Sequence, residues 1–199
     1  VLFMLALKIA KEFGALKEDD YLKYIYNIKI IPSYLSKLLQ LNHEIIEIAN
    51  QIKHAKNIIF LGRGILYPLA LEGALKLKEI SYIHAEGFAA GEMKHGPIAL
   101  IDENMPVVFI APQDESFSKI LANIEEVKAR KGIIITITDK INNSLKLLSD
   151  HTLVIPKTHK HVFPITCSVV LQMLAYELAV CRDCEIDQPR NLAKSVTVE

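Results

Sequence analysis

The chain has 199 residues, of which 51% are hydrophobic, and its 23 basic and 23 acidic side chains give a formal net charge of zero. This length can bury the core of one domain, and the balanced charge shows neither a nucleic-acid-binding surface nor a polybasic membrane patch. The three cysteines are odd in number and clustered late, which excludes a disulfide framework and favours a reducing, cytoplasmic setting.

Residues 1–40 are predicted to be a helical segment leading into the main domain. Its first part, VLFMLALKIAKEF, is apolar at helical spacing, but it is too short to cross a membrane and has no basic start. We therefore expect a helix cut from a longer polypeptide, ending near Gly14. A connecting stretch should follow, with Pro32 favouring a new helix, and residues 41–55 should form an amphipathic helix.

Residues 57–81 predict a strand, a turn and a helix. Asn57–Leu61 is a short apolar run rich in β-branched and aromatic residues, as in a buried strand. The turn Gly62-Arg63-Gly64 leaves backbone N–H groups uncovered, and Pro68 suits the first turn of a helix. The amino end of that helix would point its free N–H groups at the crevice above the strand.

Three charged residues of this helix, Glu72, Lys76 and Glu79, fall on one face at i, i+4 and i+7. Lys76 and Glu79 are close enough to touch. One interpretation is a solvated helix face with intrahelical ion pairs. The other is a carboxylate base beside a cation, in the crevice at the carboxyl end of a parallel strand.

The rest of the chain alternates strands with helices. The stretch SYIHAEGFAAGEMKHGP is predicted to be a loop that places polar groups, with a short strand near Tyr82–His84. Strands are then expected over residues 105–111, 133–139 and 151–156, and helices over 115–131, closed by Gly132, and 141–149. This order predicts an α/β fold with a five-stranded parallel sheet flanked by helices, doubly wound.

The apolar stretch 164–181 predicts a buried core or dimer-interface helix rather than a membrane span. At its end, Cys181-x-x-Cys184 has no second pair and is interpreted as a chance spacing. His159-x-His161 has no accompanying carboxylate or cysteine, so no metal and no other cofactor is expected.

Three motifs, LGRGILYPLALEGALKLKEISYIHAE, AAGEMKHGP and DQPRNLAKSVTVE, resemble the carboxyl-terminal part of the glucosamine-6-phosphate synthase family. These enzymes are glutamine–fructose-6-phosphate aminotransferases (isomerising). The resemblance implies a sugar-isomerase (SIS) domain in a homodimer. Residues 1–40 would link it to an upstream SIS domain, residues 41–186 would form the second SIS domain, and residues 187–199 would be a catalytic tail.

The resemblance also implies roles that spacing alone cannot assign. Glu79 would be the proton-transfer base with Lys76 as its partner, and His95 would open the sugar ring in the site of a neighbouring subunit. Lys194 would form a Schiff base with the open-chain sugar. The remaining expected contacts to fructose-6-phosphate or glucosamine-6-phosphate come from two groups, the turn Gly62, Arg63 and Gly64 and the tail residues Arg190 and Ala193.

Two family features are missing from these 199 residues: a Ser-x-x-Ser-Gly-x-Thr phosphate loop and the glutaminase domain with its cysteine nucleophile. We therefore expect the parent protein to be the transaminase and this chain alone to be nearly inactive. Two alternatives are a non-catalytic sugar-phosphate-binding SIS module and a structural dimerisation domain. The lysine-bearing tail favours the enzyme, because neither alternative needs it.

Overall fold

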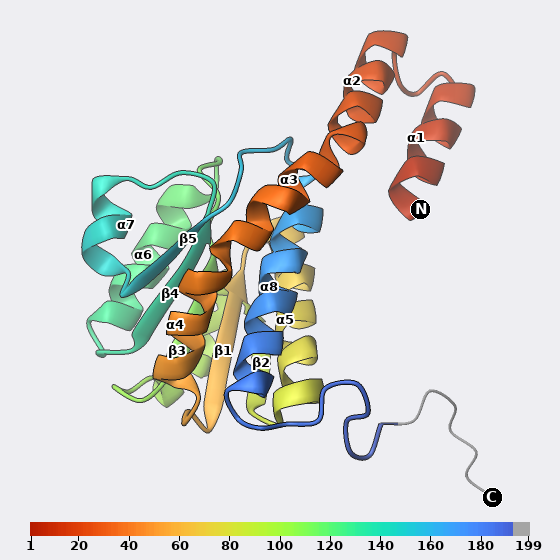
Figure 1. The fold of residues 1–199 in the computed structure, drawn as a ribbon. Coiled ribbons are helices and arrows are strands. Elements are labelled where there is room, and N and C mark those ends of the chain that lie inside the picture. The colour runs from red at the N-terminus through yellow and green to blue at the C-terminus, as the bar shows by residue number, and fades with distance from the viewer. Residues whose placement is uncertain (193–199) are drawn as a thin grey trace, which may run out of the picture.

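The computed structural model describes residues 1–192 and contains one sheet of five parallel strands in the order β2-β1-β3-β4-β5 (Figure 1). The strands are β1 (Asn57–Gly62), β2 (His84–Ala89), β3 (Pro106–Ile110), β4 (Ile133–Thr138) and β5 (His151–Val154). This order confirms the predicted doubly wound α/β class. The strand order reverses between β1 and β3, the position at which open α/β sheets usually bind ligands.

Helices and short 3-10 turns cover both faces of the sheet. One face, called here the α5 face, is covered by α4 (Asn42–Ile52), α5 (Tyr67–Ser81) and α8 (Phe163–Val180). The other, called the α6 face, is covered by α6 (Phe117–Lys128), α7 (Asn143–Leu148) and the turns η3 (Ala90–His95) and η4 (Pro97–Leu100). The alternation of strand side chains divides the buried residues into one core for each face.

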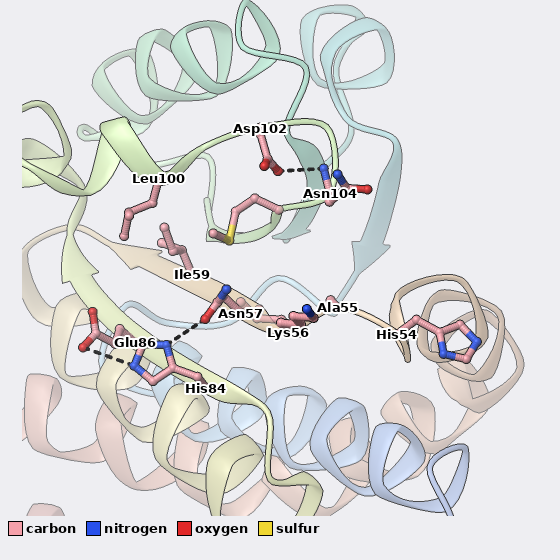
Figure 2. A pocket seen from close by; sticks show the side chains of 12 residues that line it. His54, Ala55, Lys56, Asn57, Ile59, His84, Glu86, Leu100, Asp102 and Asn104 are labelled. Atoms are coloured by element: carbon pink, nitrogen blue, oxygen red, sulfur yellow. Dashed lines mark hydrogen bonds and ion pairs between the residues drawn. The ribbon is translucent and has the colours of Figure 1, made fainter.

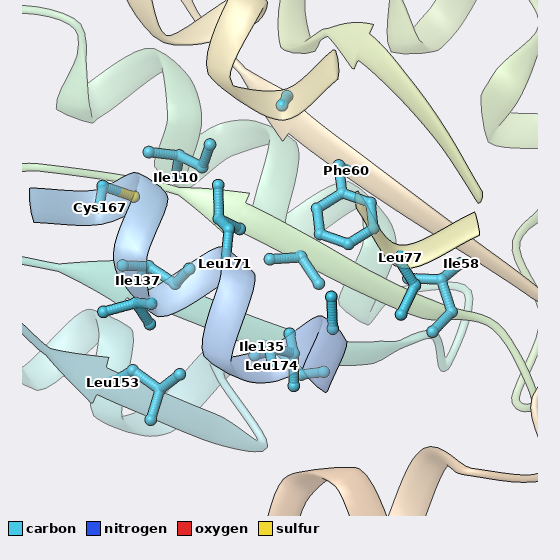
Figure 3. Packing of buried hydrophobic residues seen from close by; sticks show 14 of the residues in the cluster. Ile58, Phe60, Leu77, Ile110, Ile135, Ile137, Leu153, Cys167, Leu171 and Leu174 are labelled. Carbon is cyan, nitrogen blue, oxygen red and sulfur yellow. The ribbon is translucent and has the colours of Figure 1, made fainter. Parts of the chain in front are cut away.

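The core of the α5 face is organised around α8 (Figure 3). Leu171 and Leu174 of α8 pack with Phe60 of β1 and Leu77 of α5, and all four side chains are at most 2% exposed. By length and composition α8 could cross a membrane, but 56% of it is buried inside the protein. The prediction of a core helix is confirmed.

Glycines let α5 lie close to the sheet and to α8. A Cβ on Gly73 would lie 3.1 Å from side-chain carbons of both Phe60 and Leu171. A Cβ on Gly87 of β2 would lie 2.7–2.8 Å from backbone atoms of Leu71 and Ala70 in α5. These contacts fix the height of α5 above β1 and β2.

The amino-terminal segment differs from its prediction. The expected connecting stretch contains the helices α2 (Glu18–Lys29) and α3 (Ile31–Leu38), which follow α1 (Leu2–Glu12). Helix α2 has three acidic residues in its first turn and a lysine in its last turn, and these charges complement the helix dipole. Its apolar pattern is weak, so periodicity alone did not predict the helix. Pro32 stands in the first turn of α3, as predicted.

An aromatic cluster joins this segment to the loop before α8. Tyr24 lies 5.9 Å from Phe3 and 5.0 Å from His159, and His159 lies 5.3 Å from His161, between ring centroids. The His159-x-His161 pair therefore packs with aromatic rings. Burial, the proximity of His159 and the charge of Lys160 lower the pKa of His161.

Two boundaries in the middle of the chain were predicted wrongly. The second strand is His84–Ala89, whereas Tyr82 ends α5 in a left-handed conformation with φ of 59°. Helix α6 ends at Lys128, and Lys131, with φ of 65°, makes the left-handed turn expected of Gly132. Gly132 is needed for another reason, since a Cβ there would lie 2.7 Å from a methyl group of Val127.

The Gly87 contact yields a prediction. Gly87→Ala should lower the free energy of unfolding by about 1–3 kcal/mol, because the added methyl group meets helix backbone that cannot rotate away. Gly91→Ala is the matched control, since the nearest atom to its Cβ is the Arg63 guanidinium at 3.5 Å. Urea denaturation of both variants measures the difference, and equal midpoints would contradict the close packing of α5 on β2.

Candidate active site

Lys76 and Glu79 form a direct ion pair on the outward side of α5. Lys76 Nζ donates to Glu79 Oε2 at 2.7 Å, and the two side chains are 36% and 28% exposed. The predicted contact is therefore present. The hydrogen bond to Glu79 raises the pKa of Lys76, and burial opposes it only in part. Lys76 is thus a fixed cation beside a half-buried carboxylate.

The pair lies at the opposite end of α5 from the one predicted. Helix α5 leaves the carboxyl end of β1 and runs back along the sheet, and Glu79 comes 12 residues after its first residue, Tyr67. At 1.5 Å per residue the separation is about 18 Å. Glu79 consequently lies near the amino end of β2, and the expected position in the crevice at the carboxyl end of β1 is wrong.

The turn Gly62-Arg63-Gly64 does occupy the carboxyl end of β1. Gly62 must be glycine, because a Cβ there would lie 2.1 Å from the carbonyl oxygen of Leu66, and Gly64 has φ of 56°. The Arg63 guanidinium extends toward Gly91 in η3. Within the described chain, these residues form a group separated from Glu79 by most of the length of α5.

His95 lies across the sheet from Glu79. It ends η3, whose residues Ala90 and Met93 are buried in the core of the α6 face. Lys94, just before it, pairs with Glu126 of α6 at 2.7 Å. The His95 side chain is exposed. One copy of the chain therefore holds Glu79 and His95 on opposite faces of the sheet.

Arg190 lies at the Glu79 end of α5. Its guanidinium carbon lies 4.2 Å from the centroid of the Tyr82 ring, and its backbone N–H donates to the Tyr82 hydroxyl at 2.9 Å. Tyr82 follows Glu79 by three residues. Sequence reasoning missed Tyr82, and only its position between a helix and a strand, where glycine is usual, could have marked it. Ala193 and Lys194 lie outside the described residues.

A separate cavity of about 590 Å³ lies at the amino ends of β1 and β2, on the α6 face (Figure 2). Within it, His84 Nδ1 lies 3.0 Å from Asn57 Oδ1, and its Nε2 lies 3.7 Å from Glu86 Oε1. Of the predicted catalytic residues, the three that the structure describes, Lys76, Glu79 and His95, do not line this cavity. Among residues 1–192, no group of three or more histidine, cysteine, aspartate or glutamate side chains is placed to hold a metal ion.

The chain resembles known proteins over its whole length. The SIS domain family pattern matches residues 51–182. The chain is 51% identical over 199 residues to glutamine–fructose-6-phosphate aminotransferase (isomerizing) of Bacteroides thetaiotaomicron and 49% identical to that of Chlorobaculum tepidum, covering 100% of this chain and 32% of each relative. The chain thus spans about a third of the length of these curated relatives.

A solved structure shows the same architecture. The carboxyl-terminal domain of glucosamine-fructose-6-phosphate aminotransferase from Francisella tularensis superposes with a TM-score of 0.85 at 40% sequence identity. The superposition covers 92% of this chain and 52% of that one.

The Lys76–Glu79 pair can be tested directly. In Glu79→Gln the pKa of Lys76 should fall, because the hydrogen bond to Glu79 is the main cause that raises it. Glu72→Gln on the same helix should lower it less, since Glu72 acts only through its charge. Side-chain NMR titration of the lysine amine checks both variants. The free energy of unfolding of Glu79→Gln should change by only about 0.2–0.5 kcal/mol, as for other pairs on helix surfaces. A larger fall in the pKa of Lys76 in Glu72→Gln than in Glu79→Gln would contradict the assignment of Glu79 as its main partner.

Proposed function

This chain belongs to the SIS domain family, and we propose that it is the carboxyl-terminal sugar-isomerase domain of a glutamine–fructose-6-phosphate aminotransferase. The full-length protein would convert fructose-6-phosphate and glutamine into glucosamine-6-phosphate and glutamate. The observation that carries the proposal is the Lys76–Glu79 pair, a half-exposed carboxylate held beside a cation within a chain 51% identical to such an enzyme.

The chemistry assigns these two residues different tasks. Converting a ketose imine into an aminoaldose moves one proton between neighbouring carbons, and a single carboxylate can carry it. Glu79 is that base. A Schiff-base nucleophile must be neutral for part of the time. The raised pKa of Lys76 opposes this, so Lys76 instead holds the Glu79 carboxylate in place through their hydrogen bond.

Lys194 is the proposed nucleophile. Its amine would attack the open-chain carbonyl and expel water, giving an imine that ammonia can exchange. Lys194 follows Arg190 by four residues, a stretch that spans at most about 14 Å. Since Arg190 contacts Tyr82 at the Glu79 end of α5, this span is compatible with the proposed attack of Lys194 on a sugar beside Glu79. Arg190 and Ala193 would contribute to sugar binding from the same tail.

We propose that His95 opens the sugar ring in the site of a second copy, so the active form is a homodimer. The support is the placement of Glu79 and His95 on opposite faces of the sheet, where one chain cannot bring both to one sugar. The turn Gly62, Arg63 and Gly64 lies at the carboxyl end of the sheet, as does the beginning of η3, the turn that carries His95. We propose that it binds the same sugar as His95, in the site of the second copy. Three free cysteines and soluble phosphorylated substrates fit a cytoplasmic location.

The base is tested by Glu79→Gln in the full-length protein. Amination should fall by about 10²–10⁴-fold, because glutamine keeps the shape of the side chain but cannot accept the proton. Glu72→Gln, on the same helix, should keep its activity. Steady-state glucosamine-6-phosphate formation measures both variants, and near wild-type turnover in Glu79→Gln would return the residue to a solvated surface.

Borohydride reduction in the presence of fructose-6-phosphate identifies the nucleophile. The adduct should map to the peptide that contains Lys194 and be lost in Lys194→Arg. The peptide that contains Lys76 should stay unmodified, because its amine is held protonated by Glu79. An adduct on Lys76 would overturn both assignments.

Subunit mixing tests the shared site. Co-expression of Glu79→Gln subunits with His95→Asn subunits should restore about a quarter of wild-type activity, since each mixed dimer pairs one intact Glu79 with the partner's intact His95. Each variant alone should be inactive. If His95 served its own chain, both sites of the mixed dimer would lack one residue, and mixing would restore nothing.

A further inference from the structure

We infer that Tyr82 is a positioning residue that holds the carboxyl-terminal tail at the Glu79 end of α5. Its hydroxyl accepts a hydrogen bond from the backbone N–H of Arg190 at 2.9 Å, and its ring lies 4.2 Å below the Arg190 guanidinium. The inference rests on the proposed function for its catalytic consequence. The contact itself is independent of that function and can be measured without it.

The chain between α8 and Arg190 is anchored to the same end of α5. Arg182 donates from Nε to the carbonyl oxygen of Ser81 at 3.1 Å and from Nη1 to that of Lys53, and Cys184 Sγ lies 3.7 Å from the Ser81 oxygen. Figure 1 shows this segment passing the carboxyl end of α5. The last carbonyl groups of a helix need partners, and Arg182 supplies one. Tyr82 adds a second attachment eight residues further along the chain, at Arg190.

The backbone of Tyr82 supports a role for its side chain. Tyr82 ends α5 with φ of 59° and ψ of 16°, a left-handed conformation that favours glycine at this helix position. A bulky residue there is strained, and such strain persists where the surrounding structure uses the residue. Here the use is the stacking and hydrogen bond with Arg190, neither of which glycine could provide.

The attachment sets where the last residues begin. Tyr82 lies three residues after Glu79, and Arg190 lies four residues before Lys194, so the clamp joins the segment that bears the base to the one that bears the nucleophile. Among the hydrogen bonds of residues 1–192, those that next attach this segment to α5 are made by Arg182 and Cys184, at least ten residues before Lys194. A longer free stretch samples more positions and lowers the fraction of time in which the amine meets the sugar.

The clamp is tested first in this chain, by the rate at which carboxypeptidase digests past Arg190. Tyr82→Leu keeps the left-handed strain but removes the hydroxyl and the ring, and should speed digestion about fivefold to fiftyfold. Tyr82→Phe removes the hydroxyl alone and should have a smaller effect. Arg190→Gln should add little to Tyr82→Leu, because both act on one contact. Unchanged digestion in Tyr82→Leu, or full additivity with Arg190→Gln, would overturn the clamp.

The catalytic consequence is tested in the full-length protein. Tyr82→Leu should lower kcat by about 10–100-fold and raise KM for fructose-6-phosphate by a smaller factor, because a misplaced nucleophile affects the reaction more than the loss of one sugar contact from Arg190 affects binding. Borohydride trapping on Lys194 should fall in parallel, and Tyr82→Phe should recover part of both. Tyr26→Leu, at an exposed tyrosine of α2, is the matched control.

The outcomes separate the inference from the function on which it rests. Faster digestion with unchanged kcat and trapping would overturn the positioning role and leave the proposed function intact. An inactive wild-type protein would overturn the proposed function and the catalytic part of the inference, while the digestion result would still decide the clamp. Two results together would assign Tyr82 a purely structural role. Tyr82→Leu would lose far more thermal stability than Tyr26→Leu, and Tyr82→Phe would match wild type in kcat and in digestion rate.

Discussion

The packing of α5 against both the sheet and its neighbouring helix α8 is the constraint on which the rest of the structure depends. Gly87 lets the helix backbone approach β2, and Gly73 leaves room for the side chains of Phe60 and Leu171 to pack against the same point of the helix. The result is a helix with one fully buried side and one side open to solvent. Because α5 cannot shift without clashing, the Lys76–Glu79 pair on its open side is presented at a fixed height and angle.

The same packing separates the candidate site residues. Helix α5 carries Glu79 back toward the amino end of β2, while the chain after β2 crosses to the other face of the sheet and places His95 beside α6. A sheet with helices on both faces cannot bring these two residues together within one chain. This separation is the reason for proposing a homodimer, in which a second copy would supply the His95 that the fold keeps apart from Glu79.

Electrostatics and chain attachment complete the proposed chemistry. The hydrogen bond that raises the pKa of Lys76 makes it a poor nucleophile and a good partner for the base. The nucleophile must then come from elsewhere, and Arg190 on Tyr82 brings the tail to the correct end of α5. The proposed tasks of the two lysines differ because Lys76 has a carboxylate beside it, whereas Lys194 follows Arg190, which contacts Tyr82.

The sequence by itself determined the α/β class, the parallel sheet, the core helix 164–181 and the contact between Lys76 and Glu79, because periodicity and i, i+3 spacing are local properties. Motif likeness also singled out His95, Arg190 and Lys194. Local pattern failed at α2, at Tyr82–Ala89 and at Gly132, where dipole charges, a left-handed tyrosine and a tight side-chain contact decided the outcome. Only the tertiary structure decided that His95 lies across the sheet from Glu79 and that Tyr82 holds Arg190, because each depends on contacts between residues far apart in the chain or on opposite faces of the sheet.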